Sequence, residues 1–342
     1  MLSLPSLEAF AKGAFATAAG VATLGPAPGI ALDIPPGLSY RSVSPNYTAT
    51  QHNLSSKKDV PVPTDFGLQY KDLPLVTEDG VTLRCYLLMQ RTEISNSHGP
   101  RIEYTDQETD EEFASKRPTI LMFHGNGGNH GHRIPLARVF FVKMRCNVLM
   151  LSYRGYGHSE GSPSETGEAP LSNAQTALDY VTSHPYLRNS PVIIYGQSIG
   201  GAVAIDLASR NPSSKITALI LENTFTNLPR LVPQALPLLG PFAFLCHQKW
   251  DSVAKIPLIP RSTPILMLSG VLDEVVPREH MQELWQIASR RQGSKLSDMS
   301  VISEIGNGKS KFVEFEAGHH NDTCVQQGYW TAVADFMTSL SR

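Results

Sequence analysis

Residues 191–209 read PVIIYGQSIGGAVAIDLAS, and this stretch decides the fold. Its first five residues form an apolar run typical of a strand buried on both faces, and residues 202–209 form a short helical segment rich in small residues. Between them lies Gly196-Gln-Ser-Ile-Gly200, with a glycine two residues on either side of Ser198. These glycines remove side chains that would collide in a strained turn from strand to helix. Such a turn exposes the Ser198 hydroxyl above the sheet and aims helix N–H groups at developing negative charge, so we predict that Ser198 is a nucleophile.

Apolar runs of the same kind recur along the chain, separated by helical patterns. We predict strands at residues 82–90, 119–123, 147–152, 191–195, 216–221, 264–268 and 312–315. We predict helices at residues 171–183, 202–209, 278–288 and 325–340. Alternation of strands and helices over about 250 residues predicts an α/β fold, with a mostly parallel central sheet and helices on both faces. We expect solvated loops at 103–112, where six of ten residues are acidic, and at 289–311.

The composition excludes several protein classes. The chain has 342 residues, with 29 Lys and Arg against 31 Asp and Glu, and a formal net charge of −2. A nucleic-acid binder needs a basic excess for its phosphate contacts, so we expect no nucleic-acid partner. With 41% hydrophobic and 18% charged residues, the bulk of the chain can bury a large core and is not disordered. The four cysteines lie far apart without a Cys-x-x-Cys pair, which gives no zinc ribbon or thioredoxin motif.

Residues 1–60 differ from the rest of the chain. The uncharged stretch 13–32 is interrupted by Pro26 and Pro28, so its apolar run is shorter than the roughly 20 residues that span a bilayer. We therefore predict a leader of low order, or a membrane anchor, over residues 1–60. The main domain is predicted over residues 61–342.

A serine nucleophile needs a base and a group that orients the base. In this kind of fold the chain order is Ser, acid, His, and each partner follows a strand. Asp273 satisfies this order after the strand at 264–268, and Glu274 is the alternative acid. His319 and His320 lie in a loop before the last helix, and spacing alone leaves the choice of base between them open.

The oxyanion hole needs a second backbone N–H from the loop after an earlier strand. The strand at 119–123 is followed by a glycine-dense turn at 124–129, where the backbone can come close to a substrate. We predict that the N–H groups of Asn126 and Ile199 are the donor pair.

Three histidines near this turn raise the question of a metal. His124, His130 and His132 have no neighbouring carboxylate and no fixed helical spacing, so we predict no metal site. The predicted chemistry also needs no organic cofactor. Arg154, in the turn at 153–161, is expected to brace that turn through hydrogen bonds.

Several segments together resemble the alpha/beta-hydrolase-domain serine hydrolases, in particular the bud-emergence (Bem) suppressor-like branch and its animal hydrolase-domain relatives. In chain order they read HGNGGNHGHR, LSYRGYGHSEGSPSE, YGQSIGGAVA, LENTF, LSGVLDEVVP and HNDT. The resemblance implies an α/β-hydrolase fold over roughly residues 60–340 and a membrane-tethered serine hydrolase, with some relatives removing palmitate from proteins. It places the nucleophile on Ser198, the acid on Asp273 and the base on His320. It also implies membrane association at the endoplasmic reticulum or plasma membrane, with the cytosol as the alternative.

We therefore predict a monomeric serine hydrolase that cleaves carboxylic ester or thioester bonds through an acyl-enzyme. Residues 225–260 are apolar and broken by prolines, and we expect a short cap there that favours lipophilic acyl substrates, such as protein palmitoyl thioesters. The alternative is a helix that packs over the sheet edge. A serine peptidase or a general carboxylesterase would use the same triad. From other classes, the alternatives are a non-catalytic membrane-associated scaffold or polarity factor, and a lipid carrier.

Overall fold

The computed structural model describes residues 59–92, 108–162, 169–213, 215–235, 249–291, 302–305 and 309–341. Most of the predicted leader therefore lies outside the described residues. The predicted cap is described only at its two ends, up to residue 235 and from residue 249.

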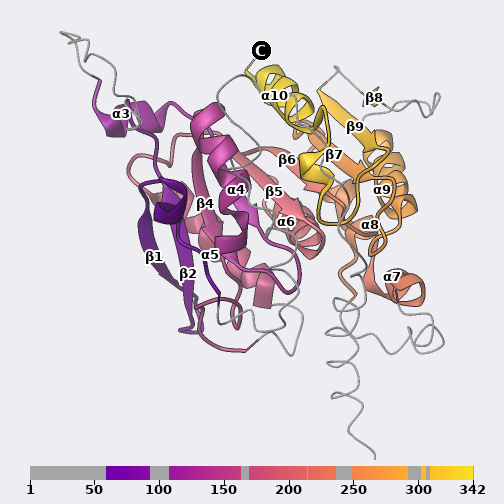
Figure 1. The fold of residues 1–342 in the computed structure, drawn as a ribbon, viewed down its shortest axis with the longest axis horizontal. Coiled ribbons are helices and arrows are strands. Elements are labelled where there is room, and N and C mark those ends of the chain that lie inside the picture. Colours follow the sequence, from indigo (N-terminus) through magenta and orange to yellow (C-terminus); the bar gives the residue numbers. More distant parts are fainter. Residues whose placement is uncertain are drawn as a thin grey trace, which may run out of the picture.

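One nine-stranded sheet forms the centre of the described domain (Figure 1). Its strands are β1 Lys71–Val76, β2 Thr82–Leu88, β3 Thr119–Phe123, β4 Asn147–Leu151, β5 Val192–Gln197, β6 Ile216–Glu222, β7 Ile265–Gly270, β8 Ile302–Ile305 and β9 Ser310–Phe315. They lie in the order β1-β2-β4-β3-β5-β6-β7-β9-β8. Strands β4, β3, β5, β6, β7 and β9 pair in parallel. At the edges the pairing is antiparallel, between β1 and β2, β2 and β4, and β8 and β9. The predicted mostly parallel sheet is confirmed.

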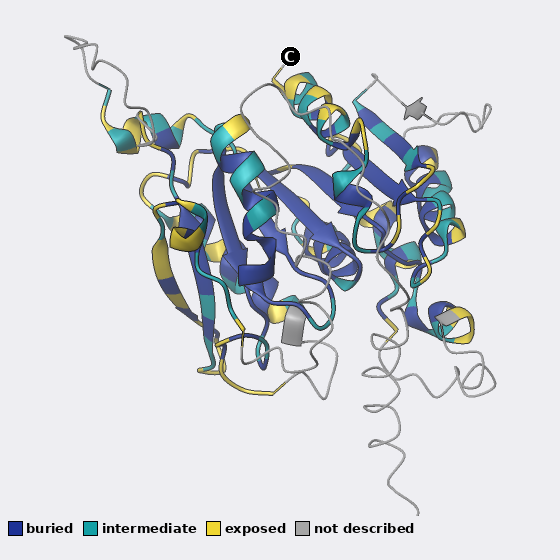
Figure 2. Cartoon of the chain, viewed as in Figure 1, coloured by how far each residue is buried: buried dark blue, intermediate teal, exposed yellow. Residues whose placement is uncertain are grey.

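Helices cover both faces of this sheet. They are α3 Asp110–Ser115, α4 Ile134–Arg138, α5 Ala169–Ser183, α6 Ile199–Arg210, α7 Leu228–Ala235, α8 Ser252–Lys255, α9 Arg278–Arg290 and α10 Tyr329–Leu340. Side chains of α5, α6 and α9 belong to one buried apolar cluster, and those of α4 and α10 belong to a second cluster. Strands β3, β4, β5 and β7 are buried along their whole length and β6 and β9 along most of it (Figure 2), which explains their apolar sequences.

The structure corrects several predicted boundaries. The acidic stretch 103–112 is not entirely a loop, because α3 begins at Asp110 with a capping box between Thr109 and Glu112. The stretch 289–311 contains β8, which pairs with β9. Strand β1 was not predicted; it is an exposed edge strand that contains a proline, a residue tolerated only at such positions.

The parallel arrangement determines where a site can form. Because the central strands point the same way, the segments that follow β3, β5, β6, β7 and β9 all leave the sheet on one side, at the carboxyl ends of the strands. The predicted site residues belong to these segments.

Candidate active site

Ser198 occupies a strained turn between β5 and α6. Its φ is 56° and its ψ is −123°, a backbone conformation that residues other than glycine rarely adopt. A Cβ at Gly196 would lie 2.7 Å from the Gly201 nitrogen, and one at Gly200 would lie 2.8 Å from the Phe123 carbonyl carbon. Both positions therefore require glycine for the close backbone approach that the motif predicts. The helix begins at Ile199, three residues earlier than expected, so its free N–H groups start directly beside Ser198.

The structure brings Asp273 and His320 together. The His320 Nδ1 lies 2.8 Å from Asp273 Oδ2, and both side chains are almost completely buried. The other carboxylate oxygen, Oδ1, accepts the backbone N–H groups of Val275 at 2.8 Å and Val276 at 2.7 Å. A carboxylate on Nδ1 keeps the proton there and leaves Nε2 as the basic nitrogen of the ring.

Burial lowers the pKa of His320, but the nearby carboxylates of Asp273, Glu274 and Glu222 outweigh burial. The net effect raises the pKa of His320 above the ordinary histidine value. The carboxylates thus stabilise the imidazolium that forms when the ring accepts a proton.

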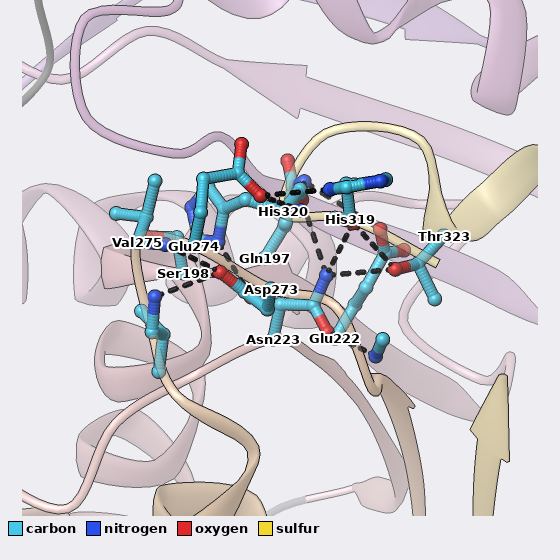
Figure 3. A network of polar contacts seen from close by, with 12 residues as sticks. Gln197, Ser198, Glu222, Asn223, Asp273, Glu274, Val275, His319, His320 and Thr323 are labelled. Carbon is cyan, nitrogen blue, oxygen red and sulfur yellow. Dashed lines mark hydrogen bonds and ion pairs between the residues drawn. The ribbon is translucent and has the colours of Figure 1, made fainter. Parts of the chain in front are cut away.

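Glu274 and His319 form a second, more exposed pair beside the first. Their side chains are 40% and 47% exposed, and Glu274 Oε2 lies 3.2 Å from His319 Nδ1. The same oxygen accepts the backbone N–H of His320 at 3.4 Å. The two alternative acids and two alternative bases, all labelled in Figure 3, therefore form one buried pair and one solvated pair. Only the buried pair has the fixed geometry that a general base needs.

The loop after β3 lies against the serine turn. A Cβ at Gly125 would be 3.6 Å from Ser198 Cβ and 3.7 Å from the Gln197 carbonyl oxygen. Asn126 and Ile199, the predicted oxyanion donors, are both half-buried residues at this junction. The Tyr156 hydroxyl donates to Asn126 Oδ1 at 2.9 Å and so restrains the loop.

The His124 side chain also restrains the loop after β3. Its Nδ1 lies 2.8 Å from the Gly125 carbonyl oxygen, and its Nε2 accepts the Tyr153 N–H at 3.3 Å. Burial lowers the pKa of His124 to about 3, so the ring is neutral and acts as a structural brace. Arg154 braces its own turn at 153–161, because its Nη2 donates to Asp79 Oδ1 at 2.7 Å in the turn between β1 and β2.

His130 and His132 are buried near the same loop. His130 Nδ1 contacts the Ser152 hydroxyl at 2.5 Å, and burial lowers the pKa of His130 to about 3. Burial likewise lowers the pKa of His132 to about 4. Within the described part of the chain, no group of three or more His, Cys, Asp or Glu side chains could hold a metal ion.

The described ends of the predicted cap lie beside α9. The side chains of Leu228 and Leu231 on α7 are buried in the core cluster. Arg230 pairs with Glu283 of α9 at 2.6 Å, and His280 Nε2 donates to Gln234 Oε1 at 2.7 Å. Helix α7 is thus a packed helix at its start, and residues 236–248 of the predicted cap lie outside the described residues.

Sequence reasoning missed three polar residues behind the site: Gln197, Glu222 and Asn223. All three are buried and hydrogen-bonded to the serine turn or to the loop that carries His320 (Figure 3). Their position was the available signal, because Gln197 ends β5 and the other two lie at the end of β6. Those strand ends belong to the same sheet edge as the predicted triad.

Comparisons with known proteins agree with this architecture. A family model described as alpha/beta hydrolase fold matches residues 118–243. The protein bem46 of Schizosaccharomyces pombe is 40% identical over 283 residues, covering 82% of this chain and 81% of its own. The alpha/beta hydrolase domain-containing protein WAV2 of Arabidopsis thaliana is 34% identical over 295 residues, with 82% of each chain covered. An uncharacterized membrane protein of Saccharomyces cerevisiae is 31% identical over 282 residues, covering 82% of this chain and 84% of its own.

Among solved structures, an esterase of Pyrococcus furiosus superposes with a TM-score of 0.58 at 16% sequence identity. It covers 82% of this chain and 92% of its own. At that identity the likeness supports the fold alone. None of the helices in the described ranges is long and apolar enough to cross a membrane.

Proposed function

Because the chain belongs to the alpha/beta hydrolase fold family and is a homologue of bem46 and WAV2, we propose that it is a serine hydrolase of carboxylic esters or thioesters. Ser198 is the nucleophile, His320 the base and Asp273 the residue that orients the base. The observation that carries this proposal is the buried 2.8 Å contact between Asp273 and His320 at the same sheet edge as the strained Ser198 turn.

The reaction follows from these positions. The Ser198 hydroxyl attacks the substrate carbonyl carbon while His320 Nε2 takes its proton, and Asp273 holds the imidazolium through Nδ1. The N–H groups of Asn126 and Ile199 stabilise the oxyanion, each contributing about 10²–10³-fold in rate. The protonated His320 then gives its proton to the leaving alcohol or thiol. Water, activated by the same base, releases the acyl group from Ser198.

For the substrate we propose lipophilic acyl groups, including protein palmitoyl thioesters. Two features support this class. Leu272, the residue before Asp273, is 49% exposed, so an apolar side chain lies on the surface beside the acid. One relative is named a membrane protein, and acylated substrates concentrate at membranes. We propose that the protein acts as a monomer at a membrane through its N-terminal region.

The test is a series of p-nitrophenyl esters from acetyl to palmitoyl, together with a palmitoyl-thioester peptide. Wild type, Ser198→Ala and Ser209→Ala are compared, because Ser209 lies at the far end of the same helix with its hydroxyl bonded to the Asp206 carbonyl. We expect activity that needs Ser198, is retained in Ser209→Ala and rises with acyl length. A fluorophosphonate probe should label wild type and Ser209→Ala but not Ser198→Ala.

Other outcomes separate the alternatives. A preference for short esters indicates a general carboxylesterase, and cleavage of peptides alone indicates a peptidase. An inert wild-type protein without probe labelling contradicts the proposal and favours a scaffold or a lipid carrier.

A further inference from the structure

The serine turn and the histidine loop are not neighbours in the sheet. Ser198 follows β5 and His320 follows β9, and both β6 and β7 lie between these strands. A proton transfer between the two side chains requires that this separation be bridged at a fixed distance. A polar contact between the segments that follow β5 and β9 could therefore set the distance between Ser198 and His320.

Gln197 makes such a contact. Its side chain is buried, and its Nε2 donates to the backbone carbonyl oxygen of His320 at 2.8 Å (Figure 3). Since Gln197 is covalently joined to Ser198, the bond ties the backbone of the nucleophile directly to the backbone of the base.

The Gln197 amide is held in one orientation. Arg133 Nη1 donates to its Oε1 at 2.5 Å, and Glu222 Oε1 lies 3.5 Å from its Nε2. A guanidinium can only donate, so Arg133 identifies the oxygen end of the amide and leaves its N–H groups to face Glu222 and the His320 carbonyl. The resulting orientation presents N–H to the His320 carbonyl.

Glu222 is itself fixed by two hydroxyl groups. Tyr195 donates to Glu222 Oε2 at 2.6 Å, and Tyr329 of α10 donates to the same oxygen. The carboxyl group is fully buried, a placement that is unfavourable unless such donors compensate. Glu222 contributes to the raised pKa of His320, and its Oε1 also faces the Gln197 amide.

Asn223 completes the support of the histidine loop. Its φ is 45°, and its Nδ2 donates to the His320 carbonyl oxygen at 3.1 Å and to Thr323 Oγ1 at 3.0 Å. Its Oδ1 accepts the Gly270 N–H at 2.8 Å, at the end of the strand that leads to the acid. The His320 carbonyl oxygen thus has two donors, one from the serine side and one from the acid side.

We infer that Gln197, oriented by Arg133 and Glu222, is a positioning residue that sets the distance between Ser198 and His320. The inference rests on the proposed function. It assigns Gln197 no contact with substrate. Its effect passes entirely through the backbone of the base.

The test uses Gln197→Met in the full-length protein, which keeps the length of the side chain and removes the amide. The matched control is Gln90→Met. Gln90 is also a buried glutamine. It donates to the carbonyl oxygens of Phe141 and Cys146 near the start of β4, at the amino ends of the parallel strands. Steady-state ester hydrolysis, the rate of fluorophosphonate labelling and the thermal midpoint are measured for all three proteins.

We expect Gln197→Met to lower kcat by about 10- to 100-fold with KM unchanged, since a misplaced base slows chemistry without altering binding. The labelling rate at Ser198 should fall by the same factor. Gln90→Met should lower the thermal midpoint and leave kcat at the wild-type value. Should Gln197→Met fail to fold, Gln197→Asn keeps an amide but is one methylene too short, and we expect the same loss of kcat.

The outcomes distinguish failure of the Gln197 inference from failure of the proposed hydrolase function. If wild type is active and the folded Gln197 variant keeps kcat within about twofold, the inference is overturned and the proposed function stands. The inference also fails if kcat falls equally in Gln90→Met, because the effect then reflects general destabilisation. An inert wild-type protein overturns the proposed function together with the inference.

Discussion

Gly200→Ala tests the close packing on which the proposed oxyanion hole depends. Gly200 is a helical residue of α6, so helix propensity alone predicts that alanine stabilises the protein by about 0.5–1 kcal/mol. The structure predicts the opposite sign. A Cβ at this position would lie 2.8 Å from the Phe123 carbonyl carbon and 2.9 Å from the His124 carbonyl oxygen, whereas ordinary contact begins at 3.4 Å.

These contacts are with backbone, so no side-chain rotation can relieve them. The Phe123 carbonyl oxygen would lie closer still, so the end of β3 must move by more than about half an ångström, and overpacking of this kind costs about 1–3 kcal/mol. After the gain in helix propensity, we expect a net destabilisation of about 1–2 kcal/mol. The displaced segment leads directly into Gly125 and Asn126, beside Ser198. We therefore expect kcat/KM to fall by about 10- to 100-fold, because an oxyanion donor is moved from its place.

The assay is ester hydrolysis at several substrate concentrations, together with thermal unfolding. Gly80→Ala is the control. Gly80 lies in the turn between β1 and β2 and has a φ of 81° with nothing within 4 Å of an added Cβ, so alanine there adds backbone strain of about 1–2 kcal/mol without any close contact. We expect Gly80→Ala to lose stability and keep its kcat/KM. A Gly200→Ala protein that is as stable and as active as wild type would refute the packing argument.

Three further predictions concern the base, its pKa and the leader. His320→Ala should lose at least about 10³-fold more activity than His319→Ala in kcat, since the buried His320 is the proposed base for Ser198. The reverse order would assign the base to His319. Activity should fall as the pH drops through the raised pKa of His320, because the protonated ring accepts no proton. Glu274→Gln removes one of the carboxylates that raise this pKa, so the acid limb of the kcat/KM profile should move to lower pH. An acid limb that does not move would contradict the role of Glu274 in raising the pKa. Deletion of residues 1–45 should leave a folded and active domain by thermal unfolding and ester hydrolysis, whereas loss of folding would show that the leader packs on the domain.

Much of the fold is predictable from sequence because the central strands are buried on both faces and so read as continuous apolar runs. The elements that escape prediction carry mixed signals. Strand β1 contains Pro74 and exposed charges, and it exists because an edge strand can leave one side unpaired. Helix α3 is short and acidic, and its only local signal is the capping box from Thr109 to Glu112.

For the site, the motifs select the candidate residues, but only tertiary contacts can pair them. Asp273 and Glu274 are adjacent, as are His319 and His320, so no spacing rule distinguishes two parallel pairings from two crossed ones. The structure distinguishes them by burial. Successive residues in these turns point in different directions, and only one acid and one base point inward.

The polar residues behind the triad explain why such a strained arrangement can persist. Ser198 and Asn223 both have positive φ, and they follow the adjacent parallel strands β5 and β6. Each such conformation costs about 1–3 kcal/mol and survives only where the surroundings over-determine it. Here hydrogen bonds hold both turns. The Thr224 hydroxyl donates to the Ser198 carbonyl oxygen at 2.7 Å. The Asn223 side chain accepts the Gly270 N–H at the end of β7 and donates to the His320 carbonyl oxygen. The strain and its compensation therefore belong to one network, so the geometry at Ser198 and that at His320 should be lost together rather than separately.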